Sequence, residues 1–305
     1  MKYQNEEIIK AGVKDYNLKT FSWYLIDVCN QACKYCGEGY GSYIHRPKST
    51  FFKNDIQKKS YKNVLKLLKI KNKDKFDVDI LGGEPTLHPD IYEIIETLCS
   101  FKNSREISLI TNLKKSYEYF KEFDKPEMNK LLICPSIHMD YYNDNLLKKI
   151  IDISKFKNIK FIPIVMVHDN PKFYSKIIEL INILTNEKIE FTVSFLTSEC
   201  GYKVNYEKNF FKKIKPLTER DNNRYNFETK KNNYSLTKHD IYDNNFYNFK
   251  GWKCKPLRYK INHFGAIYNA CTGQPLSFIS KEKCVECPLT QCGCDIQWNY
   301  EKSKV

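Results

Sequence analysis

Short apolar runs that alternate with segments of helical periodicity constrain the fold of this chain more than any other feature. Between these runs, apolar residues recur at helical spacing, as Tyr61, Val64, Leu65 and Leu68 do. After the first connection the runs lie about 25 to 30 residues apart, the length of one βα unit. The six runs with the character of β-strands lie near residues 21–28, 76–83, 105–112, 130–139, 158–167 and 188–197.

Strict alternation of strand and helix predicts an α/β fold with a parallel sheet, and six units could close most of a barrel. We therefore expect a partial (β/α)6 TIM-like barrel over residues 21–200, preceded by an N-terminal extension over 1–20. Residues 201–250 are rich in Asn, Lys and Tyr without clear periodicity, which predicts a linker with short irregular elements.

The last segment, residues 251–305, holds six of the 12 cysteines. A segment this small and rich in loops is expected to need a metal to hold it together. The sequence thus predicts a small C-terminal cysteine-rich domain. Its candidate ligands are Cys254, Cys271, Cys284, Cys287, Cys292 and Cys294.

Composition narrows the classes of protein to consider. No apolar stretch approaches the roughly 18 to 20 residues of a membrane span, and the N-terminus lacks the pattern of a signal peptide. We expect a cytoplasmic protein, whose thiols stay reduced and serve as metal ligands or reactive groups. The net charge of +14 is spread over many lysines mixed with Asn, Tyr and Ile, which indicates solvated helix faces and does not favour nucleic acid as a partner.

Three cysteines directly follow the first predicted strand, in the stretch CNQACKYC: Cys29, Cys33 and Cys36. This spacing has three competing interpretations: a redox or zinc site, an iron-sulfur site, or chance. Three thiolates would leave one iron of a 4Fe-4S cluster without a protein ligand, free to bind a cofactor or substrate. Zinc normally takes four protein ligands, or three and a water, and no fourth lies nearby in the sequence.

The other predicted strands also end in polar or glycine-rich sequence, where the reactive groups of such barrels lie. The second ends in LGGEPTLHP, the third in LITNL, the fourth carries SIHMD and the fifth runs into VMVHDN. The C-x-x-x-C-x-x-C spacing, GGEP after the second strand and TN after the third resemble the radical S-adenosylmethionine (radical SAM) superfamily. The resemblance covers roughly residues 20–197.

The resemblance implies that Cys29, Cys33 and Cys36 ligate three irons of a 4Fe-4S cluster, while SAM chelates the fourth iron through its amino and carboxylate groups. One electron then splits the sulfonium, and the resulting 5'-deoxyadenosyl radical abstracts a hydrogen from the substrate. No protein side chain beyond the cluster and cofactor is expected to be catalytic.

Several further residues match cofactor contacts of the family. Tyr35 is placed to pack on the adenine, and the alternative is a core aromatic. Gly82 and Gly83 would let the backbone approach the amino group of SAM, and Glu84 would accept a hydrogen bond from that ammonium. The residues that contact the ribose and the methionine carboxylate in the family are matched less closely. This chain has TNL where many members have TNG, and SIHMD only loosely resembles the corresponding segments. The matching positions in this chain are Thr111, Asn112, Ser136 and His138.

Three polar residues on the same rim are candidate substrate contacts: Asp140, His168 and Asn170. Asn170 is alternatively the cap of a helix that begins at Pro171, and His138 a core histidine or a donor to substrate. Cys99 and Cys134 are expected to be small buried apolar residues, and Cys200 is assigned no role.

The C-terminal cysteines resemble the auxiliary-cluster domains called SPASM or twitch. The full pattern uses seven or more cysteines for two clusters, whereas six are present here. One 4Fe-4S cluster would leave two cysteines spare, and two clusters would each fall one thiolate short. Zinc remains the alternative, and at least one auxiliary cluster is favoured.

The leading hypothesis is a radical SAM oxidoreductase acting on a small carbohydrate-like molecule or a peptide, with the auxiliary cluster in electron transfer or substrate binding. Only 28 residues precede Cys29, too few for a leader-peptide-binding region, which favours a small substrate or a separate carrier. An acidic electron donor such as flavodoxin or ferredoxin would suit the basic surface. The alternatives are an RNA- or nucleotide-modifying radical SAM enzyme and a non-catalytic metal-binding scaffold.

Overall fold

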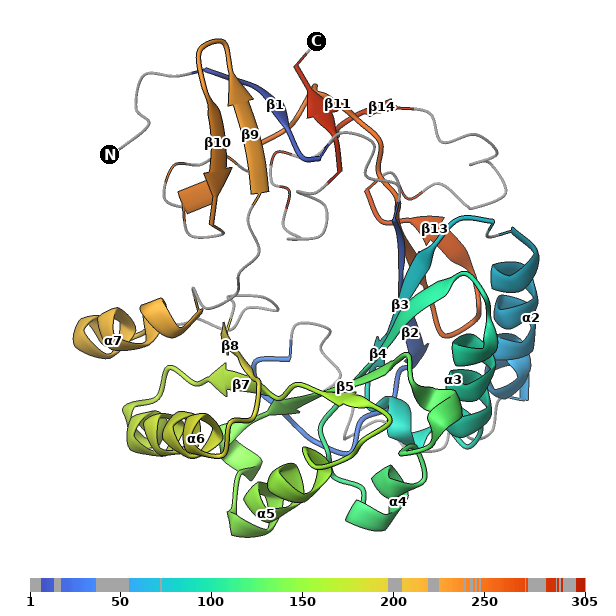
Figure 1. Ribbon diagram of the computed structural model, residues 1–305, viewed down its shortest axis with the longest axis vertical. Coiled ribbons are helices and arrows are strands. Elements are labelled where there is room, and N and C mark those ends of the chain that lie inside the picture. The colour runs from blue at the N-terminus through green and yellow to red at the C-terminus, as the bar shows by residue number, and fades with distance from the viewer. Residues whose placement is uncertain are drawn as a thin grey trace. The chain divides into compact units, whose positions relative to one another are not determined.

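The computed structural model divides the chain into two compact units (Figure 1). One, here the barrel unit, contains residues 22–218 and 261–266, and the other, here the cysteine-rich unit, contains 1–21, 219–260 and 267–305. The structure describes residues 7–13, 18–36, 55–71, 73–196, 205–218, 225–237, 240–241, 244, 246, 248–271, 273, 284–288, 290, 292 and 300–304.

The barrel unit is built on a sheet in which β2, β3, β4, β5, β7 and β8 are successive neighbours. The pairs β3 with β4, β4 with β5, β5 with β7 and β7 with β8 are parallel. This arrangement confirms the predicted α/β fold with its partial barrel. The strands are β2 (Lys19–Ile26), β3 (Phe76–Gly82), β4 (Ser104–Thr111), β5 (Leu131–Ile137), β6 (Lys160–Phe161), β7 (Ile164–Val167) and β8 (Thr192–Phe195).

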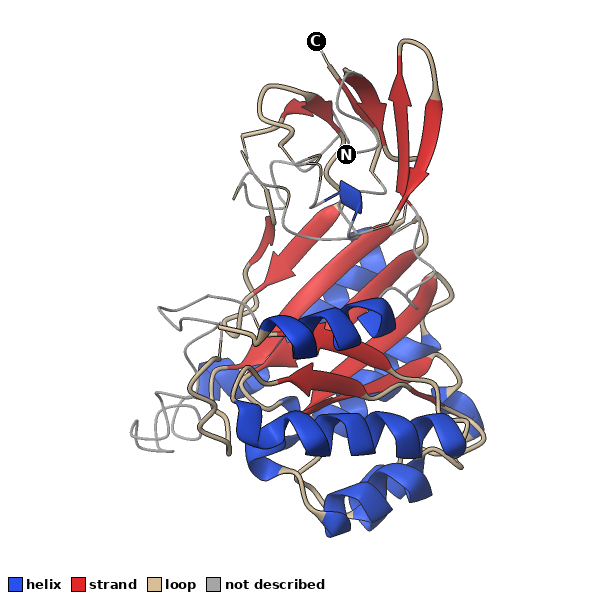
Figure 2. Cartoon of the chain, turned by 90° about the vertical axis from the view of Figure 1, so that its left-hand side faces the viewer, coloured by secondary structure: helices blue, strands red, loops and turns tan. Residues whose placement is uncertain are grey.

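Helices cover the outer side of this sheet (Figures 1 and 2). The α3 residues Ile94, Ile95 and Leu98 and the strand residues Val78 and Ile107 are all fully buried. The core therefore lies between the helices and the strands. The helices are α2 (Asp55–Lys71), α3 (Ile91–Ser100), α4 (Tyr117–Lys121), α5 (Asp144–Ile153), α6 (Tyr174–Asn186) and α7 (Lys208–Thr218), with single 3-10 turns η2 (Pro85–Leu87), η3 (Pro126–Met128), η4 (Met139–Tyr141) and η5 (Pro171–Phe173).

Two of the predicted strands are shorter than the apolar runs that indicated them. The run 158–167 contains β6 and β7 as separate pieces, and Pro163, which has no N–H to donate to a neighbouring strand, lies between them. In the run 188–197 the strand starts at Thr192, because the first residues complete the end of α6: Lys188 takes a φ of 56° and donates to Thr185 O.

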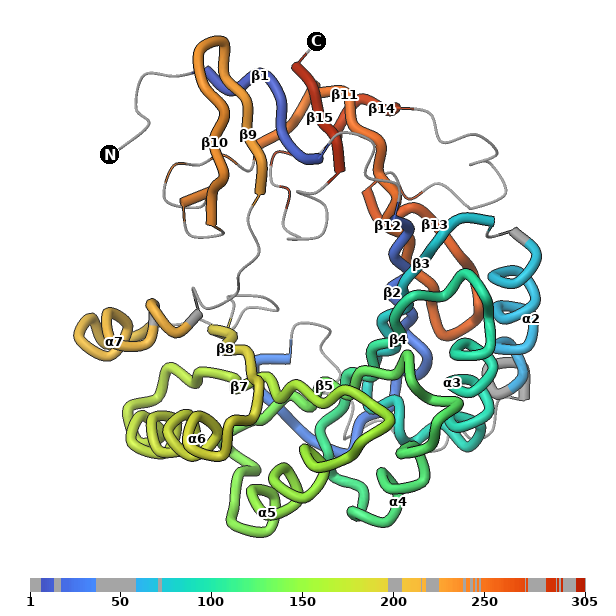
Figure 3. The backbone as a smooth tube through the Cα atoms, in the orientation of Figure 1, coloured from blue at the N-terminus to red at the C-terminus, as the bar shows by residue number. Residues whose placement is uncertain are grey.

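The cysteine-rich unit contains a sheet in the order β10-β9-β1-β15-β11-β14, in which neighbouring strands are antiparallel. Figure 3 shows β1 running beside the hairpin of β9 and β10. The strands are β1 (Ile8–Ala11), β9 (Tyr225–Thr229), β10 (Asn233–Leu236), β11 (Lys253–Cys254), β14 (Val285–Glu286) and β15 (Lys302–Ser303), and a further hairpin joins β12 (Arg258–Ile261) to β13 (Ile267–Asn269).

Regular structure is therefore present where the sequence indicated an N-terminal extension and an irregular linker. Residues 8–11 are a central strand of the sheet, and α7, β9 and β10 fall within 201–250. In β9, YNFET, the alternate residues Tyr225, Phe227 and Thr229 are buried. This alternating pattern covers only five residues, so it is hard to recognise in a segment rich in Asn and Lys. Among the described helices, none has the length and apolar character of a membrane span.

Candidate functional site

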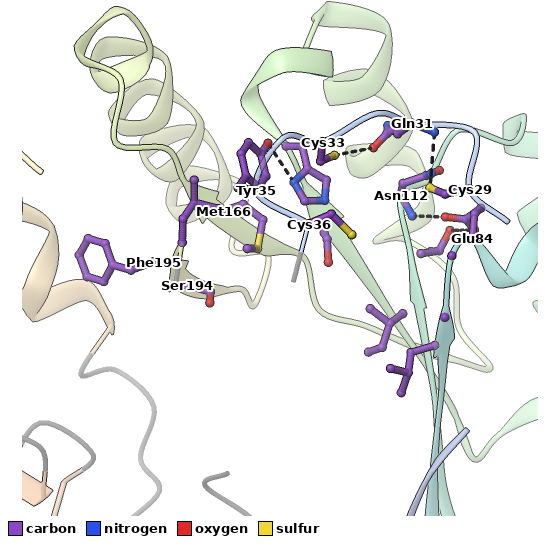
Figure 4. A pocket seen from close by; sticks show the side chains of 18 residues that line it. Cys29, Gln31, Cys33, Tyr35, Cys36, Glu84, Asn112, Met166, Ser194 and Phe195 are labelled. Carbon is purple, nitrogen blue, oxygen red and sulfur yellow. Dashed lines mark hydrogen bonds between the residues drawn. The ribbon is translucent and has the colours of Figure 1, made fainter. Parts of the chain in front are cut away.

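The three N-terminal cysteines lie on an irregular loop that follows β2. Gln31 N donates to Cys29 Sγ at 3.4 Å, and Cys36 N donates to Cys33 O at 3.2 Å, which closes a turn between the second and third cysteines. All three thiols are half-buried and line a cavity of about 330 Å³ in the barrel unit (Figure 4). This volume is within the range of small-molecule sites.

The thiols are close enough to affect one another's ionisation. Burial, together with the neighbouring Cys29 and Cys36, raises the pKa of Cys33 to about 12. Burial also raises the pKa of Cys29. The Cys29 and Cys33 thiols therefore hold their protons until a metal displaces them.

The donor set of the loop is compatible with an iron-sulfur cluster. A cluster of several irons spreads its thiolate ligands over different metals. Three neighbouring thiols on one loop can provide that without converging on a point.

The glycine pair after β3 lies against the end of β2. A Cβ on Gly82 would come within 2.3 Å of Ile26 O, and one on Gly83 within 2.1 Å of Val28 O. Gly83 N and Glu84 N donate to these two carbonyls at 2.7 and 2.8 Å. The structure thus gives these glycines a reason that the sequence did not: they allow the turn to hydrogen-bond to the strand that leads into the cysteine loop.

Glu84 is buried and accepts four hydrogen bonds. Its Oε1 accepts from Thr86 N, Thr86 Oγ1 and Thr111 Oγ1 at 3.2, 2.6 and 2.7 Å, and its Oε2 accepts from Asn112 N at 2.7 Å. Burial raises the pKa of Glu84, while these four donors oppose that shift by stabilising the charged form. The carboxylate therefore connects the turn after β3 to the end of β4. Its predicted hydrogen bond to the ammonium of SAM remains a prediction.

Asn112 connects the end of β4 to the cysteine loop. Its Nδ2 donates to Asn30 Oδ1 at 2.7 Å and lies 3.8 Å from Cys29 Sγ. Lys114 Nζ also donates to Asn30 O, at 2.9 Å. The TN sequence thus reaches the first cysteine of the loop.

Tyr35 is buried, and its hydroxyl connects the cysteine loop to the end of β5. The hydroxyl donates to Asp140 Oδ2 at 3.1 Å and lies 3.2 Å from His138 Nδ1 (Figure 4). Because its one proton goes to Asp140, the hydroxyl accepts from His138 Nδ1, which leaves His138 Nε2 as an acceptor. Burial lowers the pKa of His138 to about 4, so the ring is neutral at neutral pH. Burial also raises the pKa of Tyr35.

The three residues predicted as substrate contacts lie outside the lining of the cavity, and two of them, Asp140 and His168, lie beside Tyr35. Asp140 accepts from Tyr35, and His168 packs edge-on against the Tyr35 ring with centroids 5.1 Å apart. Asn170 caps η5 by accepting from Lys172 N at 3.1 Å, the alternative that the sequence left open. A role for these residues toward substrate stays a prediction.

All the residues predicted to bind the cluster or SAM in the barrel unit line the cavity. Its remaining wall was not foreseen. The two positions Met166 and Phe195 are half-buried on strands β7 and β8. The sequence of β7, IVMV, is apolar throughout, so it carried no signal that could have identified Met166. The additional lining residues are Gln31, Leu81, Ile110, Met166, Ser194, Phe195 and Leu196.

The cysteines outside this loop occupy different settings. Cys99 and Cys134 are buried, as expected of core residues. In the cysteine-rich unit Cys254, Cys287 and Cys292 are buried, Cys271 is half-buried and Cys284 is exposed. Cys200 and Cys294 lie outside the described residues.

Comparison with known proteins identifies the barrel unit. The sequence model described as "Radical SAM superfamily" matches residues 23–196. GTP 3',8-cyclase of Pasteurella multocida is 28% identical over 159 residues, which are 51% of this chain and 42% of that protein. GTP 3',8-cyclase of Listeria welshimeri is 31% identical over 146 residues, 45% of this chain and 41% of that protein. The matched segment spans less than half of each relative.

The fold has a counterpart among solved structures. The crystal structure of Streptococcus suis SuiB bound to S-adenosylmethionine matches with a TM-score of 0.52 at 16% identity, over 92% of this chain and 63% of that one. At this identity the likeness shows the fold alone.

Proposed function

Because the chain belongs to the radical SAM superfamily, we propose that the cavity beside its three-cysteine loop binds a 4Fe-4S cluster and SAM and starts radical chemistry on a substrate. The observation that supports this most is a convergence: the cysteine loop, the Gly-Gly-Glu turn and the Thr-Asn end of β4 line one cavity. When bound, the cluster would pass one electron from an external reductant to SAM, which would break a carbon–sulfur bond and give methionine and the 5'-deoxyadenosyl radical that takes a hydrogen from the substrate.

The chain's own residues hold and orient these groups. Cys29, Cys33 and Cys36 provide the thiolates, and Asn112 Nδ2 is placed to donate to the first of them. The neutral His138 presents Nε2 as an acceptor at the cavity wall, available to a hydroxyl or an amino group of a ligand. Met166 provides apolar lining that helps to exclude water from a radical.

For the substrate, we propose a small carbohydrate-like molecule or a peptide, oxidised with the help of at least one auxiliary iron-sulfur cluster in the cysteine-rich unit. The net charge of +14 supports an acidic electron donor such as flavodoxin or ferredoxin. The rate of reduction by such a donor should then fall as salt is added. The reduced thiols suit the cytoplasm.

A second candidate is a nucleotide-modifying enzyme. Two curated relatives are named GTP 3',8-cyclase, and the positive charge suits a phosphorylated substrate. The two candidates differ in a simple assay: a purine nucleoside triphosphate added to the reduced enzyme with SAM is consumed only by the second.

The central experiment measures iron and sulfide per chain together with SAM cleavage after anaerobic reconstitution and reduction. We expect the Cys29→Ala/Cys33→Ala/Cys36→Ala variant to lose 5'-deoxyadenosine formation while it keeps part of its iron. The matched control replaces the two core cysteines, Cys99→Ala/Cys134→Ala, and should cleave SAM. Cleavage by the triple variant at the wild-type rate would refute the proposal, and a wild-type protein that binds metal without cleaving SAM would be a scaffold.

A further inference from the structure

Four of the six C-terminal cysteines share one part of the cysteine-rich unit. Strand β11 pairs with β14 so that Cys254 faces Val285, and Cys287 N donates to Trp252 O at 2.7 Å. Cys254, Cys287 and Cys292 belong to one buried cluster of side chains. Thiols from two separate segments of the chain thus lie in one small core.

The hairpin of β12 and β13 brings the fourth cysteine back to this core. Asn269 Nδ2 donates to Pro256 O at 2.9 Å, while Asn269 Oδ1 accepts from Cys271 N at 2.9 Å. Asn269 therefore holds Cys271 next to the segment that follows Cys254. The thiols are near enough to interact: burial, together with Cys271, Cys287 and Cys292, raises the pKa of Cys254 to about 12.

A buried lysine lies next to these thiols. Lys302 is 1% exposed and is the direct cross-strand neighbour of Cys254 in the pairing of β11 with β15. Its Nζ donates to Tyr300 O at 2.9 Å and lies 5.1 Å from the centre of the Phe249 ring. The positive charge acts on both Cys254 and Cys271 and lowers their pKa against the effect of burial.

We propose that Cys254, Cys271, Cys287 and Cys292 ligate one iron-sulfur cluster, and that the ammonium of Lys302 stabilises its reduced, more negative state. This inference rests on the proposed function, to whose auxiliary cluster it assigns four ligands and a charge partner. The proposal leaves Cys284, which is exposed, outside the set of ligands.

The physical basis is the cost of burying charge. Burying an ammonium group costs desolvation free energy unless negative charge lies nearby, and four thiolates with their cluster would supply that charge. Reduction adds one electron, taken from an external reductant, to a centre that is already anionic. A fixed positive charge next to the ligands favours that step, since net charge and surroundings set the potential of such clusters.

The test uses full-length protein in the Cys29→Ala/Cys33→Ala/Cys36→Ala background, so that the remaining iron reports on the C-terminal centre alone. Lys302→Gln removes the charge and keeps a donor for Tyr300 O, and Lys302→Met removes both. The control is Lys253→Met: Lys253 is exposed, adjoins Cys254 in sequence and pairs with Ser303 on the same strand as Lys302. A redox titration with dithionite, followed by electron paramagnetic resonance, gives the midpoint potential of each variant.

We expect both Lys302 variants to shift the midpoint to more negative potential. At the wild-type midpoint, their ratio of oxidised to reduced cluster should rise at least tenfold, which for one electron is 59 mV. The control should change the ratio less than threefold. A shift in the Lys302 variants no larger than that of the control overturns the role of Lys302.

The iron content of single cysteine variants in the same background tests the assignment of the ligands. This test does not depend on whether the Lys302 variants fold. We expect Cys271→Ala to lose most of its iron and Cys284→Ala to keep it. Iron lost equally from both variants, or zinc in place of iron in the parent protein, overturns the assignment. Cleavage of SAM by the wild type is a separate readout, so the proposed function can fail while this centre is confirmed, and the reverse.

Discussion

Replacing Glu84 with glutamine tests whether its carboxylate holds together the turn after β3 and the end of β4. Each oxygen of Glu84 accepts from a backbone N–H, one from Thr86 and the other from Asn112. A glutamine must point its NH2 group at one of these two donors. The variant therefore loses a hydrogen bond to a charged group and leaves a buried N–H facing another donor.

The expected cost follows from these two losses. A hydrogen bond to a charged group contributes about 1.5 to 3 kcal/mol, and a buried unsatisfied donor costs about 1 to 3 kcal/mol. Removing a buried charge offsets part of this, because burial disfavours the ionised form of Glu84. We expect a net decrease in the free energy of unfolding of about 2 to 4 kcal/mol.

The measurements are urea denaturation and hydrogen exchange of the amide of Asn112, whose protection should fall in the variant. Glu96→Gln is the matched control, since Glu96 is exposed on α3 in the same unit, and it should stay within about 0.5 kcal/mol of wild type. If Glu84→Gln is as stable as Glu96→Gln and the amide stays protected, the carboxylate does not hold the two segments together.

Three further results are expected. Burial lowers the pKa of His88 to about 4 from 6.5, so between these values the unfolded chain binds a proton that the folded chain does not. The free energy of unfolding should therefore fall by about 1.4 kcal/mol per pH unit as the pH decreases from 6.5 to about 4. Urea denaturation of wild type and of His88→Gln over this range checks this, because the stability of the variant should depend less on pH. Gly83→Ala should cost at least about 1 to 3 kcal/mol in urea denaturation because its Cβ would meet Val28 O at 2.1 Å; a variant as stable as wild type would contradict the steric reason. Tyr35→Phe keeps the ring and loses two hydroxyl hydrogen bonds, so iron should be lost to a chelator several-fold faster than from wild type, and an unchanged rate would show that the hydroxyl does not hold the cysteine loop.

The sequence predicted the parallel barrel because buried strands and amphipathic helices leave strong periodic patterns. Element ends were less predictable where a single residue decides them. Pro163 divides one apolar run into β6 and β7. Lys188 has a positive φ at the end of α6, so β8 begins later than its apolar run does. The strand Ile8–Ala11 carried no such pattern, since its partners are β15 and β9, which lie hundreds of residues away in the chain.

At the site, the sequence predicted the residues better than their contacts. The cysteine spacing and the Gly-Gly-Glu turn mark the cavity, because each is a local pattern. The four hydrogen bonds of Glu84 could not be foreseen, since half of them come from residues 27 and 28 positions away on another strand. Lys302 gave no signal in a chain with 50 Lys and Arg residues, because burial distinguishes it and composition does not.

The antiparallel pairing of β1 with β15 has a consequence for the order of assembly during synthesis. Lys302 faces both Ala11 and Cys254, so this sheet needs strands made at the beginning, near the middle of the last third, and after 300 residues of translation. Domains generally fold as units while the ribosome is still at work, and residues 22–218 leave it much earlier. In nascent chains stalled before residue 300, we expect the barrel unit to be protected from proteolysis, while Ile8–Ala11 can pair with β9 and still lacks β15 as its second partner. Full protection of Ile8–Ala11 should therefore appear only after β15 has been made.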